Sequence, residues 1–436
     1  MDPFEMNAEE VLKKVRQMLR EGAMQRIPYP IRAKVEEQLD DLTEMLSGDR
    51  LPRFAVVGRR GAGKSSLINA IFGQPVAEVG ATASTTGRGS WYTYESERGG
   101  IEVLDTRGLG EGSAPRRGGA TTALLDIESS LTERCPDALL VLVKAKEMDA
   151  RIDDDLASIK EILAFVERKH EYRLPIVGVV TQVDELDPAD ITDPPFDDAD
   201  KQANIDAVEG MLRAKLADGL GIEAGRVVDI VPTCAYMRMK DGAIAVDRRW
   251  NIERLLLLLV EHLPKSAQVQ LARVSMLRSV RVKVAGTLVK ATSGVAAAVA
   301  ITPIPVADVF PLLGLQCSMI VALGIIGGKK MDMAAAREFL ASMGAAVGMG
   351  LVARETFRQV AKFVPGFGSV VGAGIAYTTT WSLGRAATAY YITGASEEEA
   401  RTILRREQEK EPPEAGEAIK LLEHHEDGEQ PGSGHS

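Results

Sequence analysis

The chain has 436 residues and a formal net charge of −10 at pH 7, with 45% hydrophobic and 26% charged residues. This length predicts two or three domains, and the negative charge argues against general nucleic-acid binding, which relies on cationic side chains. The three cysteines, Cys135, Cys234 and Cys317, are too far apart for a disulfide framework or a metal motif, so we expect a reducing, cytoplasmic location.

Two helices are predicted within residues 1–51, where apolar side chains recur at helical spacing and Pro28 and Pro30 interrupt the pattern. From Pro52 onward, short apolar runs alternate with helical patterns, which is typical of βαβ units and a mainly parallel sheet. The runs predicted as buried strands are Phe54–Val57, Ile101–Leu104, Ala138–Val143, Ile176–Val180 and Val227–Val231. Ser90–Glu95 alternates and predicts an antiparallel edge strand, and Asn251–His262 predicts a helix that closes an α/β domain of residues 52–264.

Residues 265–410 predict an all-helical, apolar domain. Val309–Gly328 and Phe363–Gly384 are uncharged stretches of 20 and 22 residues with cationic flanks, long enough to span a membrane. Their prolines and polar residues also fit the alternative, a buried helical hairpin in a soluble domain. Ser396–Glu399 predicts a capping box that opens a last helix, and residues 411–436 predict a disordered tail.

A glycine-rich motif, Gly58-Arg-Arg-Gly-Ala-Gly-Lys-Ser65, stands between the first predicted strand and a helix, which is the context of a phosphate-binding P-loop. Its glycines let backbone N–H groups converge on phosphates, and the helix N-terminus attracts anions. We expect Lys64 to bind the β- and γ-phosphates and the Ser65 hydroxyl to bind Mg²⁺. The residues assigned to nucleotide binding here are Gly58, Gly61, Ala62, Gly63, Lys64, Ser65 and Ser66.

Two further elements predict contacts to Mg²⁺ and to the γ-phosphate. Asp105 ends a predicted strand and begins Asp-Thr-Arg-Gly108, where the carboxylate can hold Mg²⁺ through water and the Gly108 N–H can meet the γ-phosphate. Thr86, favoured over Thr85, lies in a Ser/Thr-rich segment and binds Mg²⁺ only when the γ-phosphate is present; a plain surface loop is the alternative. The predicted metal ligands are Ser65, Thr86 and Asp105, and Lys64 and Thr86 are the predicted catalytic residues.

A guanine-reading site is predicted at the ends of two later strands. A carboxylate at Asp184, in Thr-Gln-Val-Asp, can accept two hydrogen bonds from guanine, whereas adenine offers no such donor pair. The segment that follows the last strand, Thr233-Cys-Ala235, can present a backbone N–H to the guanine carbonyl. Taken singly, either motif also fits an ordinary turn. The predicted base site comprises Thr181, Gln182, Asp184, Thr233, Cys234 and Ala235.

Together these motifs resemble the Era-like branch of the translation-factor-like GTPases over about residues 52–264. The resemblance implies a Ras-like P-loop GTPase domain that binds GTP, GDP and Mg²⁺ and hydrolyses GTP slowly. It also implies that Thr86 belongs to switch I, that Asp105 and Gly108 belong to switch II, and that Thr181, Asp184 and Ala235 form the base site.

The sequence departs from that family at three positions. Gln182 replaces a lysine that packs on the base, Gly61 replaces the asparagine of potassium-dependent members, and Leu109 replaces the glutamine that positions water in Ras-like members. Hydrolysis therefore needs another group to assist the attack of water on the γ-phosphate. Arg59, Arg60 and Arg107 are candidates for an arginine finger, with passive or solvated arginines as the favoured alternative.

The C-terminal residues resemble a helical domain seen beside Era-like GTPases in YcjF-like bacterial proteins. Ile301–Asp308 and Ala361–Gly372 carry this resemblance, which spans about residues 270–394, and the overall layout is similar to the immunity-related GTPases. We expect a GTPase whose nucleotide state controls a helical domain that engages a membrane, at its inner face, or self-assembles into dimers or larger oligomers. The alternatives are a soluble nucleotide-gated interaction protein with negligible turnover and a dynamin-like remodelling GTPase.

Overall fold

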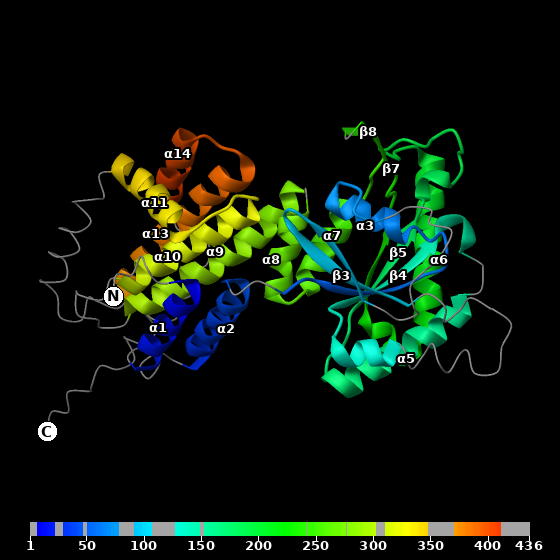
Figure 1. The fold of residues 1–436 in the computed structure, drawn as a ribbon, viewed down its shortest axis with the longest axis horizontal. Coiled ribbons are helices and arrows are strands. Elements are labelled where there is room, and N and C mark those ends of the chain that lie inside the picture. Colours follow the sequence, from blue (N-terminus) through cyan, green and yellow to red (C-terminus); the bar gives the residue numbers. More distant parts are fainter. Residues whose placement is uncertain are drawn as a thin grey trace, which may run out of the picture. The chain divides into compact units, whose positions relative to one another are not determined.

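The computed structural model describes residues 7–21, 29–46, 50–77, 91–106, 127–148, 152–241, 243–275, 277–301, 310–347 and 370–410. It divides into two compact units, drawn in Figure 1. One unit, here called the sheet unit, comprises residues 50–280. The other, the helical unit, combines residues 1–49 with residues 281–436, so the N-terminal helices group with the C-terminal ones.

The sheet unit is built on six strands in the order β2-β3-β1-β4-β5-β6. The strands are β1 (Arg53–Val57), β2 (Trp91–Ser96), β3 (Gly99–Asp105), β4 (Ala138–Lys144), β5 (Ile176–Thr181) and β6 (Val227–Pro232). All neighbouring pairs are parallel except β2 with β3. This topology confirms the predicted fold class, a Ras-like α/β domain with a mainly parallel sheet and an antiparallel edge strand.

Helices pack against this sheet and bury its central strands. They are α3 (Lys64–Phe72), α5 (Ile152–His170), α6 (Ala199–Leu220), α7 (Ile252–His262) and α8 (Lys265–Val274). One buried cluster joins Leu139 and Val141 of β4 with Ile159 of α5 and Leu212 of α6. Strands buried in this way need apolar side chains on both faces, which explains their unbroken hydrophobic runs.

A two-stranded hairpin, β7 (Met237–Lys240) and β8 (Ala243–Asp247), was not anticipated from the sequence. Its strands mix charged and apolar side chains, and most of them are exposed. The signal that was present is the Asp241-Gly242 pair, a preferred two-residue hairpin turn, and Asp241 has the positive φ of 52° that such a turn requires.

The helical unit contains two N-terminal and several C-terminal helices among its described residues. They are α1 (Ala8–Glu21), α2 (Tyr29–Leu46), α9 (Arg278–Ile301), α10 (Phe310–Ile326), α11 (Met333–Val347), α13 (Val370–Thr388), a π-helical turn (Ala389–Thr393) and α14 (Glu397–Gln408). The boundary between the two units falls within α9, which belongs to the helical unit from residue 281 onward. The apolar helix α10 packs against α1, α11 and α13. The buried Gln316 amide donates to the Thr380 hydroxyl over 3.0 Å, which links α10 to α13. The Ser396–Glu399 capping box is confirmed, and the predicted tail of residues 411–436 lies outside the described residues.

The predicted membrane stretches coincide only in part with described helices. Val309–Gly328 corresponds largely to α10, and Phe363–Gly384 to the first part of α13, which begins at Val370. Among the described residues, one helical segment, Arg278–Ala300, is long and apolar enough to cross a membrane, and 61% of its most apolar window is buried within the protein. A buried core helix has the same properties, so membrane insertion stays a prediction.

Candidate nucleotide-binding site

The P-loop joins the carboxyl end of β1 to the N-terminus of α3, and its glycines are required by its backbone. Gly61 and Gly63 have φ angles of 83° and 85°, in the left-handed region that favours glycine. A Cβ on Gly58 would lie 2.7 Å from the carbonyl oxygen of Leu142. The Ala62 N–H donates to the Arg59 carbonyl over 3.1 Å, which closes the turn.

The phosphate-binding lysine and the predicted metal carboxylate lie together at this edge of the sheet. Asp105 ends β3 beside Val56 of β1, and Lys64 begins α3. The Lys64 ammonium donates to the Gly58 carbonyl and lies 3.6 Å from the Asp105 carboxylate, with the side chains 10% and 12% exposed. The structure thus brings together two residues that the sequence assigned to one phosphate and metal site.

The donor set at this point fits Mg²⁺. That ion is held in nucleotide sites by one or two protein oxygens, with water and substrate phosphate completing the octahedron. Asp105 supplies a carboxylate, and Ser65 and Ser66 lie in the first turn of α3 beside it. Thr86 and Gly108, like Arg107 and Leu109, lie outside the described residues.

The strand end that carries the predicted base site is hydrogen-bonded to the P-loop. The buried Thr181 hydroxyl donates to the Ala62 carbonyl over 2.9 Å, and the Gln182 amide donates to the Gly61 carbonyl over 2.8 Å. Gln182 therefore does more than replace a lysine, because its side chain fixes the P-loop backbone. These two bonds set the spacing between the phosphate end and the base end of the site.

Asp184 lies in a short 3-10 turn, Val183–Glu185, opposite the fully buried Cys234. Burial, together with the charge of Asp184 and the hydrogen bond to its carboxylate, raises the pKa of the Cys234 thiol to about 12. The thiol is therefore protonated at neutral pH and can donate to that carboxylate.

Backbone bonds identify which N–H of the Thr233–Ala235 segment can meet guanine. The Thr233 N–H donates to the Val180 carbonyl over 2.7 Å, and the Cys234 N–H donates to the Trp250 carbonyl over 3.2 Å. Within the described part of the chain the Ala235 N–H has no such acceptor. Ala235 is therefore the donor that fits a guanine carbonyl.

Two buried polar residues near the site were not anticipated. Asn69 on α3 accepts from the Val76 and Ala77 N–H groups at 2.8 and 2.7 Å and donates to the Ala77 carbonyl. It thereby fixes the segment that leads toward the predicted switch I. Lys201 on α6 is the second, and it contacts the Asp184 turn. Neither residue differs from the helical sequence pattern around it. Only the tertiary structure shows what each side chain contacts.

The arginine-finger candidates differ in their surroundings. The Arg59 guanidinium lies 3.5 Å from the Asp155 carboxylate of α5, so it is paired within its own unit. Arg60 is exposed. This pairing is neither the solvated state nor the phosphate contact of the alternative, and the finger role of Arg59 stays a prediction.

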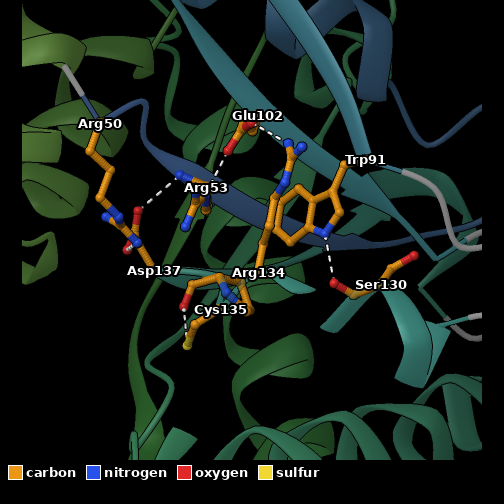
Figure 2. Close-up of polar contacts among 9 residues, drawn as sticks. Arg50, Arg53, Trp91, Glu102, Ser130, Arg134, Cys135 and Asp137 are labelled. Carbon is orange, nitrogen blue, oxygen red and sulfur yellow. Dashed lines mark hydrogen bonds and ion pairs between the residues drawn. The ribbon is translucent and has the colours of Figure 1, made fainter. Parts of the chain in front are cut away.

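A second polar cluster lies at the opposite, amino-terminal ends of the parallel strands (Figure 2). It includes Arg50, Arg53, Glu102, Arg134, Cys135 and Asp137. Trp91, which is also drawn and donates to the Ser130 carbonyl, pairs instead with Leu104 near the carboxyl end of β3. Asp137, 2% exposed, accepts from the Arg50 guanidinium at 2.7 Å and from the Arg53 N–H at 2.9 Å. Glu102 accepts from the side chains of Arg53 and Arg134. Burial raises the pKa of Asp137 despite these donors. The cluster joins β1, β3 and β4 at their starts and has no part in the P-loop.

Comparison with known proteins finds a family model that is similar to the part of the chain containing the P-loop. Residues 53–181 match the family model described as 50S ribosome-binding GTPase. This range contains the P-loop, Asp105 and Thr181 and stops short of Asp184 and Cys234. The match supports guanine-nucleotide binding by this part of the chain.

Three solved structures illustrate what the chain is similar to. A dimerization-deficient mutant of Toc33 from Arabidopsis thaliana is 18% identical, covering 57% of this chain and 95% of that one, with a TM-score of 0.35. Aquifex aeolicus Era bound to GDP·AlF4⁻ is 18% identical, covering 56% and 67%, with a TM-score of 0.31. An oligomerised bacterial dynamin pair is 10% identical, covering 96% and 74%, with a TM-score of 0.33.

Proposed function

We propose that this protein binds GTP and GDP together with Mg²⁺ and hydrolyses GTP slowly to GDP and phosphate. The observation that carries the proposal is the pair of hydrogen bonds from Thr181 and Gln182 to the P-loop carbonyls. They hold a phosphate-binding loop and a base-reading turn at one edge of the sheet. Neither motif alone distinguishes a GTPase from another P-loop protein, whereas the two in this arrangement form a guanine-nucleotide site.

Each residue has a defined role in this proposal. Lys64 binds the β- and γ-phosphates, and Ser65 and Asp105 hold Mg²⁺, which neutralises charge on the phosphates when bound. The Asp184 carboxylate accepts from the ring N–H and exocyclic amine of guanine, and the Ala235 N–H donates to its carbonyl. Thr86 binds Mg²⁺ when the γ-phosphate is present, and the Gly108 N–H contacts that phosphate.

Titration calorimetry with GTP, GDP and ATP, each with and without Mg²⁺, tests the binding site. Adenine cannot donate two hydrogen bonds to Asp184, so we expect ATP to bind at least about a hundredfold more weakly than GTP, since hydrogen bonds to charged groups contribute about 1.5–3 kcal/mol each. Equal affinity for ATP and GTP would show that the base assignment is wrong.

Phosphate release separates slow turnover from the alternative, a nucleotide-gated interaction protein with negligible hydrolysis. Leu109 favours that alternative, because an apolar side chain cannot orient the attacking water. We expect multiple turnovers of GTP that require Mg²⁺. Release that stays at the rate in protein-free buffer supports the alternative.

We further propose that the nucleotide state controls the helical unit, which engages a membrane at the cytoplasmic face or associates with further copies of the chain. The apolar character of α10 supports this proposal, as do the cationic residues that follow it, Lys329 and Lys330. A dynamin-like remodelling activity additionally requires nucleotide-dependent assembly on lipid.

A further inference from the structure

A fully buried lysine lies behind the turn that carries Asp184. Lys201 belongs to the first turn of α6, whose N-terminus is capped by the Asp198 side chain, and its own side chain is 0% exposed. Lysine is rarely buried to this extent unless its ammonium group has partners, because removing the charge from water is costly.

The partners of Lys201 are the backbone of the base-reading turn. Its ammonium donates to the carbonyls of Asp184 and Leu186 over 2.9 and 2.5 Å. It also lies over the ring of Phe196, 5.4 Å from the centroid, in cation–π geometry. Burial lowers the pKa of Lys201, and the nearby Asp184 charge opposes that effect. The ammonium thus holds the turn from its inner side.

The contacts of Lys201 extend, through Phe196 and Trp250, to Cys234 on the other side of the proposed base site. Phe196 packs edge-on against Trp250, with 5.3 Å between ring centroids. Trp250 exchanges two backbone hydrogen bonds with Cys234, at 3.2 and 2.8 Å, and the Cys234 thiol contacts the Asp184 carboxylate. Lys201 therefore connects, through aromatic side chains, the two segments proposed to read neighbouring groups of guanine.

We propose that Lys201 is a positioning residue for guanine recognition, which fixes the Asp184 turn against the Thr233–Ala235 segment. This inference rests on the proposed function, because it assigns Lys201 to the same base site. Lys201 does not touch the nucleotide. It orients the carboxylate that does, so its loss affects discrimination between bases more than binding of the phosphates.

The test compares affinities for GTP and inosine triphosphate, which lacks the exocyclic amine, in the full-length protein. We expect the wild type to prefer GTP by at least about tenfold, the value of one hydrogen bond to a carboxylate. In Lys201→Met the apolar stem remains but the donors are lost, and we expect this preference to fall to about twofold or less. The affinity for inosine triphosphate should fall less than that for GTP, because inosine keeps only the ring N–H as a donor to Asp184 and the P-loop contacts remain.

Asn204→Ala is the matched control. The Asn204 amide lies on the same helix and donates to the Asp187 carbonyl over 3.0 Å, in the same loop but beyond the Asp184 turn. This variant should keep the wild-type preference for GTP. A loss of preference in Lys201→Met alone supports the proposal.

Other outcomes overturn it. If folded Lys201→Met keeps the wild-type ratio, or loses affinity for both nucleotides by one common factor, Lys201 has no positioning role. If that variant does not fold, Lys201→Gln, which retains a polar donor group, is measured instead with the same expectation of a reduced ratio. If neither variant folds, Lys201 is a core structural residue and the proposal is wrong. A wild type that binds neither nucleotide, or both equally, contradicts the proposed function itself.

Discussion

Lys64 is the residue on which we expect phosphate binding to depend most directly. Its ammonium lies between the Gly58 carbonyl and the Asp105 carboxylate, where the β- and γ-phosphates of a nucleotide are expected. We expect Lys64→Ala to weaken GTP binding by at least about tenfold, because a charge-assisted contact is lost. Titration calorimetry measures this. Lys160→Ala, which removes an exposed lysine of α5, is the control and should bind normally. Unchanged affinity in folded Lys64→Ala would remove the P-loop assignment.

We expect Asp184 to determine which base is bound. An amide at this position presents a donor where xanthine has a carbonyl and guanine has an amine. We expect Asp184→Asn to lose the preference for GTP and to bind xanthosine triphosphate more tightly than the wild type does. Competition between the two nucleotides measures the change. A variant that still selects guanine would show that another group reads the base.

The cysteines provide a prediction about pH. Burial raises the pKa of Cys135 and Cys317 to about 11, and that of Cys234 to about 12. The thiolate is the reactive form, so at pH 8 only about one thiol in a thousand is reactive at a pKa near 11. We expect slow alkylation by iodoacetamide in the native protein, about tenfold faster per pH unit up to pH 11, with the half-buried Cys135 modified first. Mass spectrometry locates the adducts, and the urea-unfolded chain is the control. Rapid alkylation of native Cys234 at pH 8 would contradict the buried base site.

At the scale of single elements, the sheet was predictable because its strands are short, apolar and separated by helical patterns. Phe54–Val57 and Ile176–Val180 each agree with the observed strand to within one residue. The P-loop, Asp105, Thr181 and Asp184 were assigned from order and placement, and their roles in nucleotide binding stay predictions. The exposed β7–β8 hairpin was missed because a strand without a buried face has no hydrophobic period.

Some contacts of the proposed base site could not be predicted from the sequence. A lysine in the first turn of a helix normally has its charge in water, and the sequence contains no sign that Lys201 turns inward. Its two carbonyl partners lie 15 and 17 positions earlier in the chain, in a turn whose conformation depends on the packed unit. Tertiary contacts of this kind have no local pattern. The hydrogen bond from Gln182 to Gly61, across 121 positions, was hidden for the same reason.

The Asp137 cluster stabilises the starts of β1, β3 and β4, and its loss should affect stability rather than nucleotide binding (Figure 2). Removing one partner of a buried ion pair costs about 3–5 kcal/mol. We expect Asp137→Ala to lower the free energy of unfolding in urea by about 3 kcal/mol while GTP affinity at low temperature stays normal.

Asp193→Ala is the control in the same unit. It breaks the ion pair with Arg248, in which the aspartate is 69% exposed, and should cost less than about 1 kcal/mol. Equal costs for the two variants would show that Asp137 is not a structural centre.

At the scale of the whole molecule, the chain begins in the helical unit, passes through the sheet unit and returns. The helical character of both terminal regions was predictable from their sequences, but the packing of α1 against α10 was not, because about 300 residues separate them. The chain therefore enters the sheet unit from one part of the helical unit and leaves it into another. A change at the nucleotide site has two covalent connections through which to reach the helices.

Lys329, Lys330, Lys362 and Arg385 flank the apolar stretches, and clusters of this kind are attracted to anionic lipid, by about 1 kcal/mol per residue near the surface. We expect the full-length protein with a non-hydrolysable GTP analogue to float with vesicles that contain phosphatidylserine, and to do so less with neutral vesicles or GDP. Lys64→Ala, which should bind the analogue more weakly, is the nucleotide control at an analogue concentration that saturates only the wild type.

Salt distinguishes two forms of membrane binding. Protein held at the lipid surface by charge should be released at high ionic strength, because the screening length shrinks to about 3 Å at 1 M. Protein with inserted helices should remain bound. If the protein stays at the bottom of the gradient under every condition, membrane engagement is wrong.

Light scattering in the absence of lipid then decides between self-assembly and a soluble interaction protein. A mass that rises with the GTP analogue indicates nucleotide-dependent self-assembly. A constant monomer mass would leave the soluble, nucleotide-gated interaction protein, in which the apolar faces of α10 and α13 serve only the core of the helical unit.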